Sequence, residues 1–346
     1  MTPCGLERKL QGRAGVPLAG TPRHESIYQR SSIPSKKPSF PAHTREETPG
    51  GFHPREGPQT PVEWLVVGDV HGDWDAVDET FLLRGTQDLV LFVGDFGDED
   101  LELVACIAAL DVPKAVILGN HDAWFAMRGR RSERALRQIE MLGADHLGFA
   151  ARSVAGGALA VVGGRPFTWG GEWGRYRSFY ARHFGVDSDR ASMERIVAAA
   201  DEHPGVPLVL LGHNGPRGLG EGADAIFGRD FRKPFIDFGD PDLQLALEEL
   251  QRRGRKVAAT IAGHMHHILR GGGSRRRVAV LGGTVHLNAA VVPRHVPAAG
   301  GKERHFMRVV IAGGECLLAE DLWVDDRAHI VRTERLHPLS ESRPRS

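Results

Sequence analysis

Five short segments of this chain each begin with a glycine at the end of a hydrophobic run and carry metal-binding side chains. They are Gly68-Asp69-Val70-His71-Gly72, Gly94-Asp95-Phe96-Gly97-Asp98, Gly119-Asn120-His121-Asp122, Gly212-His213-Asn214 and Gly263-His264-Met265-His266. A strand that stops at a glycine turn and then presents a carboxylate or imidazole is how an α/β protein places ligands at one rim of its sheet. The donors are oxygens and imidazole nitrogens without thiolates, which favours a hydrolytic centre of two metal ions acting on phosphate esters.

The composition argues against several other classes of protein. The chain has 346 residues, enough for one large or two ordinary domains, and Lys plus Arg equals Asp plus Glu at 44 each. This balance gives no field that favours nucleic acid or a membrane as a partner. No apolar run approaches the roughly 18 residues that span a bilayer. Three widely spaced cysteines predict neither a disulfide framework nor a zinc ribbon, so a reducing compartment is expected.

The two ends differ in composition from the rest. Residues 1–61 are rich in Pro, Gly, Ser, Arg and His and show no periodicity, which predicts a disordered extension. Nine basic residues against five acidic ones leave an organelle transit peptide as the alternative to an extension without function. We therefore expect a cytoplasmic protein, with a plastid as the alternative location. Residues 333–346 are predicted to form a loose tail.

Between these ends, strand-like and helix-like runs alternate. Strands are expected at Glu63–Gly68, Asp88–Val93 and Lys114–Leu118, separated by helices at Asp73–Arg84 and Leu101–Leu110. This order predicts a parallel sheet with right-handed crossovers. A long helix is expected near Ala123–Leu142, and further strands at Ala158–Val162, Pro207–Leu211, Val257–Ala262, Val278–Leu281 and Met307–Ile311.

Two later segments carry separate predictions. The runs that flank Gly271-Gly272-Gly273-Ser274 are expected to pair as a hairpin, which makes part of the sheet antiparallel. Residues 164–235 contain one clear strand and are rich in Trp, Arg and Gly. We interpret them as an insertion that caps the site and sets specificity.

The spacing of the motifs indicates one shared site. Asp69 and His71 are two positions apart at a strand end and point to the same side. Asp95 follows Asp69 by 26 residues and Asn120 follows Asp95 by 25, one βαβ unit each. Asp95 is thereby placed between two ion positions. Each histidine alone could be a core or surface residue, but their repetition after glycine favours a site.

These ordered motifs resemble the calcineurin-like metallophosphoesterase superfamily over roughly residues 63–332. The resemblance implies a four-layer αββα sandwich of mixed sheets flanked by helices, of the metallo-dependent phosphatase type. It implies two ions drawn from Fe, Mn and Zn. One ion would be held by Asp69, His71 and His266, the other by Asn120, His213 and His264, with Asp95 bridging them.

A mechanism follows from the resemblance and from the chemistry of two close cations. Two such ions would lower the pKa of a water between them, and the hydroxide so formed would be the expected nucleophile toward phosphorus. His121 would stabilise or protonate the leaving oxygen, and Asp98 would hydrogen-bond that imidazole. Helix N-capping is the alternative for Asp98 and the favoured interpretation for Asp122.

Differences from the motifs of phosphoprotein phosphatases in this superfamily narrow the range of expected substrates. Phosphoprotein phosphatases carry Asp-Arg-Gly and an Arg before GNHE, where this chain has Asp98-Glu99-Asp100 and Leu118. The guanidinium groups that would clamp a phosphoserine are missing from those positions. We therefore expect a small phosphomonoester or phosphodiester, with nucleotides among the candidates. With residues 288–294 after the last histidine motif, the chain resembles a branch of this superfamily found in cyanobacteria and plants.

Two alternatives compete with this function. The first is a nuclease, which the neutral charge and the lack of a basic stripe make unlikely. The second is a non-catalytic metal-binding scaffold, although every expected position is filled. The sequence does not predict the oligomeric state.

Three softer features also carry expectations. Arg294 is expected in a solvated loop, and Arg275-Arg276-Arg277 at a charged hairpin tip. An aromatic cluster could pack within the cap or stack a nucleobase, and it consists of Phe167, Trp169, Trp173, Tyr176, Phe179 and Tyr180.

Overall fold

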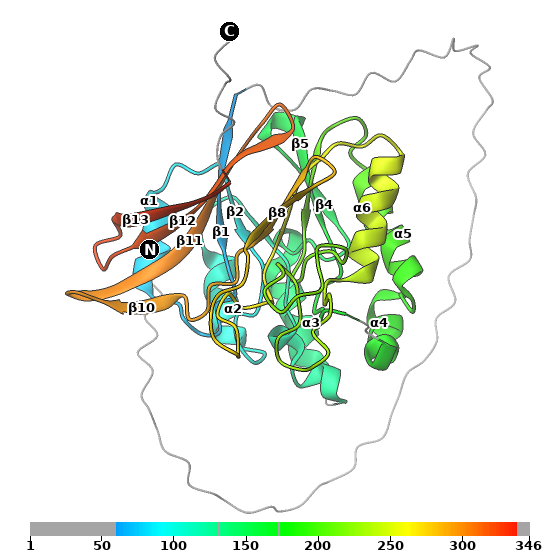
Figure 1. Cartoon of the computed structure of the whole chain (residues 1–346), viewed down its shortest axis with the longest axis horizontal. Coiled ribbons are helices and arrows are strands. Elements are labelled where there is room, and N and C mark those ends of the chain that lie inside the picture. The colour runs from blue at the N-terminus through cyan, green and yellow to red at the C-terminus, as the bar shows by residue number, and fades with distance from the viewer. Residues whose placement is uncertain (1–59, 130–131, 172–173, 338–346) are drawn as a thin grey trace, which may run out of the picture. The chain divides into compact units, whose positions relative to one another are not determined.

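The computed structural model describes residues 60–129, 132–171 and 174–337 (Figure 1). The predicted extension, apart from its last two residues, lies outside this part of the chain, and so does Trp173. The strands are β1 (Val62–Val67), β2 (Leu89–Phe92), β3 (Lys114–Val116), β4 (Ala151–Val154), β5 (Leu159–Gly163), β6 (Leu208–Leu211), β7 (Val257–Ala262), β8 (Val278–Leu281), β9 (Thr284–Asn288), β10 (His295–Ala298), β11 (Gly301–Ala312), β12 (Glu315–Val324) and β13 (Ile330–His337). The α-helices are α1 (Ala76–Arg84), α2 (Leu101–Ala109), α3 (Glu133–Leu142), α4 (Arg177–Phe184), α5 (Asp189–Asp201) and α6 (Pro241–Arg252).

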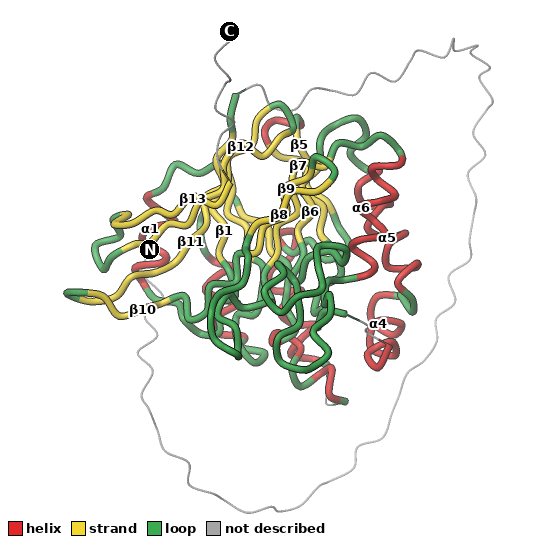
Figure 2. Tube along the Cα trace, in the orientation of Figure 1, coloured by secondary structure: helices red, strands yellow, loops and turns green. Residues whose placement is uncertain are grey.

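The strands form two mixed sheets, as expected for the α/β sandwich. The first has the order β13-β12-β11-β1-β2-β3, with β10 added beside β11, and the second has the order β4-β5-β6-β7-β9-β8. Within them, β1, β2 and β3 run parallel, and so do β5, β6, β7 and β9. The strands lie in the middle with α5 and α6 along one side, and loops gather at one end of the strands (Figure 2).

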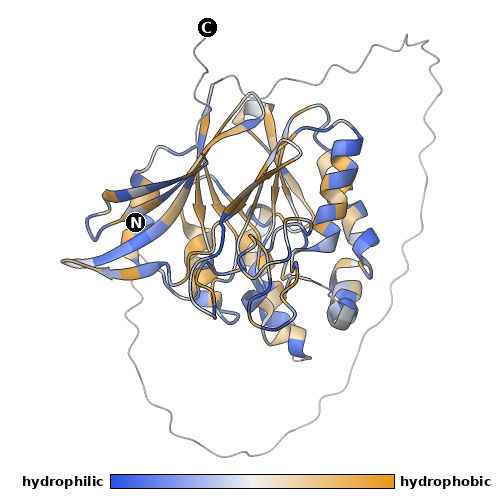
Figure 3. Cartoon of the chain, in the orientation of Figure 1, coloured by the Kyte–Doolittle hydropathy of each residue, from blue (hydrophilic) through white to orange (hydrophobic). Residues whose placement is uncertain are grey.

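Successive side chains along a strand point to opposite faces of the sheet and pack into two different apolar clusters. In β1, Trp64 and Val66 enter the cluster that both sheets share, whereas Leu65 and Val67 join the cluster that contains helix residues. This period of two is what a strand buried on both faces produces. β2, β5 and β6 are accordingly apolar throughout. The edge strand β13 is mostly exposed and largely hydrophilic, and the outer faces of α5 and α6 also carry hydrophilic residues (Figure 3). Burial on both sides fixes the strand register, and the register fixes where each motif loop begins.

Three expectations about local structure are wrong. β7 does not pair with β8 across the glycine-rich segment: β7 pairs in parallel with β9, and β8 forms its hairpin with β9 around Gly282 and Gly283. The long helix is instead two short 3₁₀ turns, η1 (His121–Ala123) and η2 (Ala126–Arg128), followed by α3. The tail was predicted to begin at residue 333, but β13 continues to His337 and pairs with β12.

Residues 164–235 contain α4, α5 and β6 in addition to loops. The helix α5 packs against α6 and β5, and so contributes to the layer that covers the second sheet. The cap role of the whole segment stays a prediction. No helix in the described ranges has the length and apolar character needed to cross a membrane.

Candidate metal centre

The five motif loops meet at the rim where the parallel strands of both sheets end. The first loop is tied to the second by a backbone bond from His71 N to Asp95 O (2.7 Å), and the fifth to the fourth by one from Gly263 N to His213 O (2.7 Å). The imidazole of His213 spans the two sheets, because its Nδ1 lies 2.6 Å from the carbonyl oxygen of Val93. Fastened loops hold the side chains in place before any ligand arrives.

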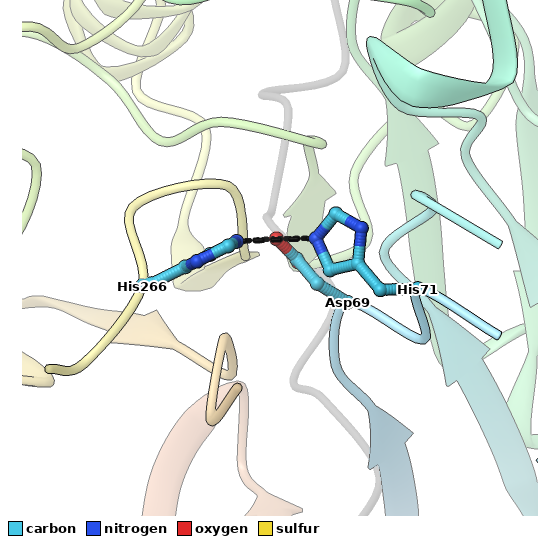
Figure 4. A group of neighbouring side chains, drawn as sticks. All are labelled: Asp69, His71 and His266. Atoms are coloured by element: carbon cyan, nitrogen blue, oxygen red, sulfur yellow. Dashed lines mark hydrogen bonds and ion pairs between the residues drawn. The ribbon is translucent and has the colours of Figure 1, made fainter. Parts of the chain in front are cut away.

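One half of the rim is built around Asp69. The imidazoles of His71 and His266 both point toward its carboxylate, with Nε2 atoms 3.9 and 3.5 Å from Oδ2 (Figure 4). Asp69 is fully buried, and both of its oxygens accept a hydrogen bond from the amide of His264. These three side chains could hold one metal ion, since their ligand atoms all lie within 4.8 Å of one another.

The other half is joined to the first by Asp95. Its Oδ2 lies 3.6 Å from Nε2 of His71, and its Oδ1 lies 3.4 Å from Nε2 of His213. Around His213 Nε2 are also Oδ1 of Asn120 (3.0 Å) and Nδ1 of His264 (3.2 Å). The two oxygens of Asp95 thus face the two halves, as a bridging carboxylate requires.

The spacing of the nitrogens fits metal coordination. His71 Nε2 and His266 Nε2 are 3.1 Å apart, and His213 Nε2 and His264 Nδ1 are 3.2 Å apart. Two nitrogens bound to one ion at about 2.0–2.1 Å lie about 2.8–3.4 Å from each other in octahedral or tetrahedral geometry. The donor set, imidazole with carboxylate and amide oxygen, suits Mn, Fe or Zn. The residues therefore fit two such ions.

In His213 and His264, the ring nitrogen that points away from the centre is hydrogen-bonded to a main-chain carbonyl, which fixes which nitrogen faces the centre. A carbonyl oxygen only accepts, so Nδ1 of His213 carries the proton that it donates to Val93, and Nε2 of His264 donates to the carbonyl of Trp169 at 3.1 Å. When a metal is bound, His213 Nε2 and His264 Nδ1 therefore present their lone pairs to it. Main-chain carbonyls commonly hold ligating histidines in this way.

Backbone geometry at the rim is strained. His71, Asp95 and His264 have φ values of 46°, 53° and 66°, in the left-handed region that non-glycine residues rarely adopt. The motif glycines leave room for the carboxylates, because a Cβ at Gly119 would clash with Oδ1 of Asp95 and one at Gly263 would clash with Oδ1 of Asp69. This explains why glycine precedes the ligands.

Without cations, protons balance the buried carboxylates. Burial opposes ionisation of Asp95, but the imidazole of His213 outweighs it and holds the pKa of Asp95 well below its usual range. Burial likewise opposes a charge on His213, yet Asp95 raises the pKa of His213 to about 10. Burial also opposes ionisation of Asp69, but the pKa of Asp69 is lowered overall, chiefly by its hydrogen bond with His266. Both carboxylates are thus ionised and suited to cations.

His121 lies beside this group, and one of its ring nitrogens is within 4.8 Å of ligand atoms of His71 and Asp95. Its Nδ1 is 2.6 Å from Oδ1 of Asp98, and its ring meets that of His71 edge-on at 4.8 Å. Trp124 stacks on the His121 ring with 4.5 Å between centroids and 13° between planes. The guanidinium carbon of Arg128 lies 3.3 Å from the Trp124 centroid. The sequence offered Asp98 as a partner of His121, but gave no signal for Trp124 or Arg128.

Asp122 does not cap a helix, contrary to the favoured expectation. Its carboxylate accepts hydrogen bonds from the amides of Asp95 (2.9 Å), Phe96 (2.9 Å) and Gly119 (2.7 Å). It is fully buried and joins the second motif loop to the third. Its place directly after Asn120 and His121 was the only available signal.

Two expectations about arginines are also wrong. Arg294 is 1% exposed rather than solvated, and its guanidinium donates to Asp78 at 2.7 Å. Arg275 is 4% exposed rather than at a hairpin tip, and it donates to the carbonyls of Ala223 and Ala225. Buried guanidinium groups need such partners, which are remote in sequence.

Packing accounts for most of the predicted aromatic cluster. Phe167 and Tyr180 are fully buried, and Phe179 contacts both. Trp169 lies in a stack between Trp124 (5.1 Å) and Tyr176 (5.4 Å). Phe167, Trp169 and Tyr180 therefore belong to a packed layer, whereas Tyr176 and Phe179 also line a cavity of about 340 Å³.

A cavity of about 200 Å³ opens beside the metal-binding side chains. It is lined by five residues of the centre and by five others, in full Asp95, Asn120, His121, His264, His266, Asp230, Phe231, Met265, Ile268 and Arg270. The cavity therefore offers a substrate direct access to both halves of the centre.

A family model described as calcineurin-like phosphoesterase matches residues 64–267, more than half of the chain. Comparison with curated protein sequences finds no match. Among solved structures, the protein TT1561 of Thermus thermophilus is similar with a TM-score of 0.44 and 12% identity, covering 80% of this chain and 100% of that one. A conserved uncharacterised protein of Streptococcus pneumoniae TIGR4, described as a predicted phosphoesterase, has a TM-score of 0.32 and 13% identity, covering 80% and 97%.

Proposed function

The chain belongs to the calcineurin-like phosphoesterase family, and we propose that it hydrolyses small phosphate esters at a dinuclear metal centre. One ion would be held by Asp69, His71 and His266, and the other by Asn120, His213 and His264. Asp95 would bridge them. Two such ions supply an acidified water and neutralise charge on the phosphate when bound.

A single observation carries this proposal. The carboxylate of Asp95 presents one oxygen to His71 and the other to His213, while the lone pairs of His213 and His264 are turned inward by main-chain carbonyls. The inner nitrogens, His213 Nε2 and His264 Nδ1, lie 3.2 Å apart, a separation that two ligands of one ion would also have. Because the outer nitrogens donate to carbonyls, the inner ones can serve a cation.

The chain's own residues divide the remaining work. The amide of Asn120 faces the cavity, where it can orient the phosphate. His121 has Nδ1 committed to Asp98, so its Nε2 is the atom that can give a proton to the leaving oxygen. Asp98 fixes the tautomer and orientation of this ring. The loops that carry these groups are tied together, so little reorganisation is needed during the reaction.

The substrate is proposed to be a phosphomonoester or phosphodiester of low molecular weight. The cavity of about 200 Å³ lies below the roughly 300–1,000 Å³ of pockets that enclose drug-sized ligands. Mn, Fe and Zn remain the candidate ions. A cytoplasmic location remains our expectation, with a plastid as the alternative.

Hydrolysis of two chromogenic substrates tests the proposal. The full chain, loaded with Mn²⁺, would be assayed with p-nitrophenyl phosphate and with bis-p-nitrophenyl phosphate. Asp95→Asn removes the bridging charge, and Asp111→Asn makes the same change at an exposed position between α2 and β3. We expect turnover of at least one ester by the wild type and by Asp111→Asn, and its loss in Asp95→Asn.

Two results would contradict the proposal. Equal turnover in the wild type and Asp95→Asn would place the activity elsewhere. Bound metal without turnover of either ester would favour the scaffold alternative.

A further inference from the structure

Beyond the metal-binding groups, the cavity has a wall of different chemistry. Phe231 and Ile268 line it and expose 43% and 55% of their surface. Arg270 lines it as well, with its guanidinium carbon 5.6 Å from the Phe231 ring centroid. Two large apolar side chains and a cation thus stand directly beside a centre that itself binds only charged or polar groups.

The guanidinium of Arg270 is available to a ligand. Apart from its place over the Phe231 ring, the guanidinium makes no ion pair or hydrogen bond with any residue in the described ranges. The backbone amide of Arg270 donates to Oδ2 of Asp230. Asp230, the one acidic group on this wall, is already paired with Arg275 at 3.2 Å. The wall therefore offers apolar surface and hydrogen-bond donors, with its negative charge offset.

Contacts on the side away from the cavity hold Phe231 and its loop in position. Arg275 donates to the carbonyls of Ala223 and Ala225 and pairs with Asp230, which precedes Phe231 in the loop. Phe231 meets Phe238 edge-on at 5.3 Å, and Phe238 in turn stacks on the imidazole of His264. A wall held in place this way can select a ligand, since little ordering is needed on binding.

We infer that this wall receives the organic group of the ester, and that this group is an aromatic ring with hydrogen-bond acceptors at its edge, as in a nucleobase. The inference rests on the proposed function, because it places the phosphate at the metal centre. The ring lies against Phe231 and Ile268, and Arg270 donates to its acceptor atoms. Sugar phosphates and phosphorylated peptides without such a ring leave the wall exposed to water.

A pair of esters with the same leaving oxygen tests this. Thymidine 5′-phosphate and 2-deoxyribose 5-phosphate both release a primary alkoxide from the same sugar, so their difference reports the base. Each would be used as the monoester and as its methyl diester, with the Mn²⁺-loaded full chain. The variants are Phe231→Ala and, as matched control, Phe235→Ala, since Phe235 is similarly exposed at 42% and does not line the cavity.

We expect the wild type and Phe235→Ala to prefer the thymidine ester by about tenfold or more in kcat/KM, the range of base stacking on an aromatic side chain. Phe231→Ala should lose that preference, because kcat/KM for the thymidine ester should fall by about tenfold more than kcat/KM for the deoxyribose ester. Equal kcat/KM for the two esters in the wild type would overturn the inference. So would a parallel loss on both esters in Phe231→Ala.

Binding separates this inference from the proposed function. If neither ester is hydrolysed, the proposed function fails, and calorimetric titration with the same monoesters then tests the wall alone. Tighter binding of thymidine 5′-phosphate that disappears in Phe231→Ala would support the wall. Equal binding of both monoesters would overturn it.

Discussion

Oδ1 of Asp98 lies 2.6 Å from Nδ1 of His121, while the face of the same imidazole rests on Trp124 with only 13° between the ring planes. One contact fixes the tautomer and the other fixes the tilt of the ring. Together they direct Nε2 of His121 toward the cavity that the metal-binding residues also line. Both contacts can be tested by the dependence of rate on the leaving group.

Asp98→Asn should slow esters with poor leaving groups selectively. An alkoxide needs a proton as it departs, whereas p-nitrophenolate does not, so only the alkyl ester depends on a well-oriented His121. We expect kcat on an alkyl phosphate to fall by about 10- to 100-fold, with a change below about threefold on the p-nitrophenyl ester. Steady-state kinetics on both substrates would show this, and an equal loss on both would contradict it.

Trp124→Leu should produce a weaker form of the same pattern, because the ring loses its stacking surface but keeps Asp98. The loss on the alkyl ester is expected at about 2- to 12-fold, corresponding to about 0.5–1.5 kcal/mol for an aromatic pair. Trp124→Phe should restore most of the rate. If Trp124→Leu alters metal content instead, Trp124 supports the centre rather than His121.

The buried pair of Arg294 and Asp78 should matter for folding. Their side chains are 1% and 0% exposed, and His295 contacts the same carboxylate at 2.8 Å. Removing one partner leaves an uncompensated buried charge, so Arg294→Met should lower the free energy of unfolding by about 3–5 kcal/mol. Urea denaturation measures this. Arg190→Met is the control, since its pair with Glu194 is exposed and contributes at most about 1 kcal/mol.

Acid should destabilise the fold through two buried histidines away from the rim. Burial lowers the pKa of His146 and of His286 to about 4, and Nε2 of each has no hydrogen-bond partner among the described residues. The unfolded chain binds their protons near pH 6.5 and the folded chain only near 4, so stability is full above 6.5 and falls toward 4. Each should contribute about 1.4 kcal/mol per pH unit in that window.

Urea titrations at pH 7, 6 and 5 would measure this slope. In His146→Gln, the change in the free energy of unfolding between pH 6 and 5 should be smaller by about 1.4 kcal/mol, the value for one proton per pH unit. A slope unchanged by the substitution would show that His146 is not the group that titrates.

Short-range signals in the sequence predicted the rim well. The glycine before each ligand marks a strand end, and the parallel strands bring those ends together, so the meeting of Asp69, Asp95 and His213 follows from local pattern and topology. The alternation of strands and helices gave the sheet order of β1, β2 and β3 for the same reason.

Features decided by remote partners were not predictable. Arg294 and Arg275 were expected to be solvated because their partners are far away in the sequence. Arg294 pairs with Asp78, and Arg275 donates to the carbonyls of Ala223 and Ala225. The hairpin was misplaced because β9, a short strand, separates β7 from β8. Phe231 was a loop residue of no evident role until the loop was placed beside the cavity.

The number of metal ions bound per chain tests the central claim most directly. After loading with Mn²⁺ and dialysis, elemental analysis should find two ions in the wild type. His266→Ala and Asn120→Ala should each retain one, because each removes a ligand from a different half, and Asp95→Asn should retain fewer than one. One ion in the wild type, or two in Asp95→Asn, would contradict a dinuclear centre bridged by Asp95.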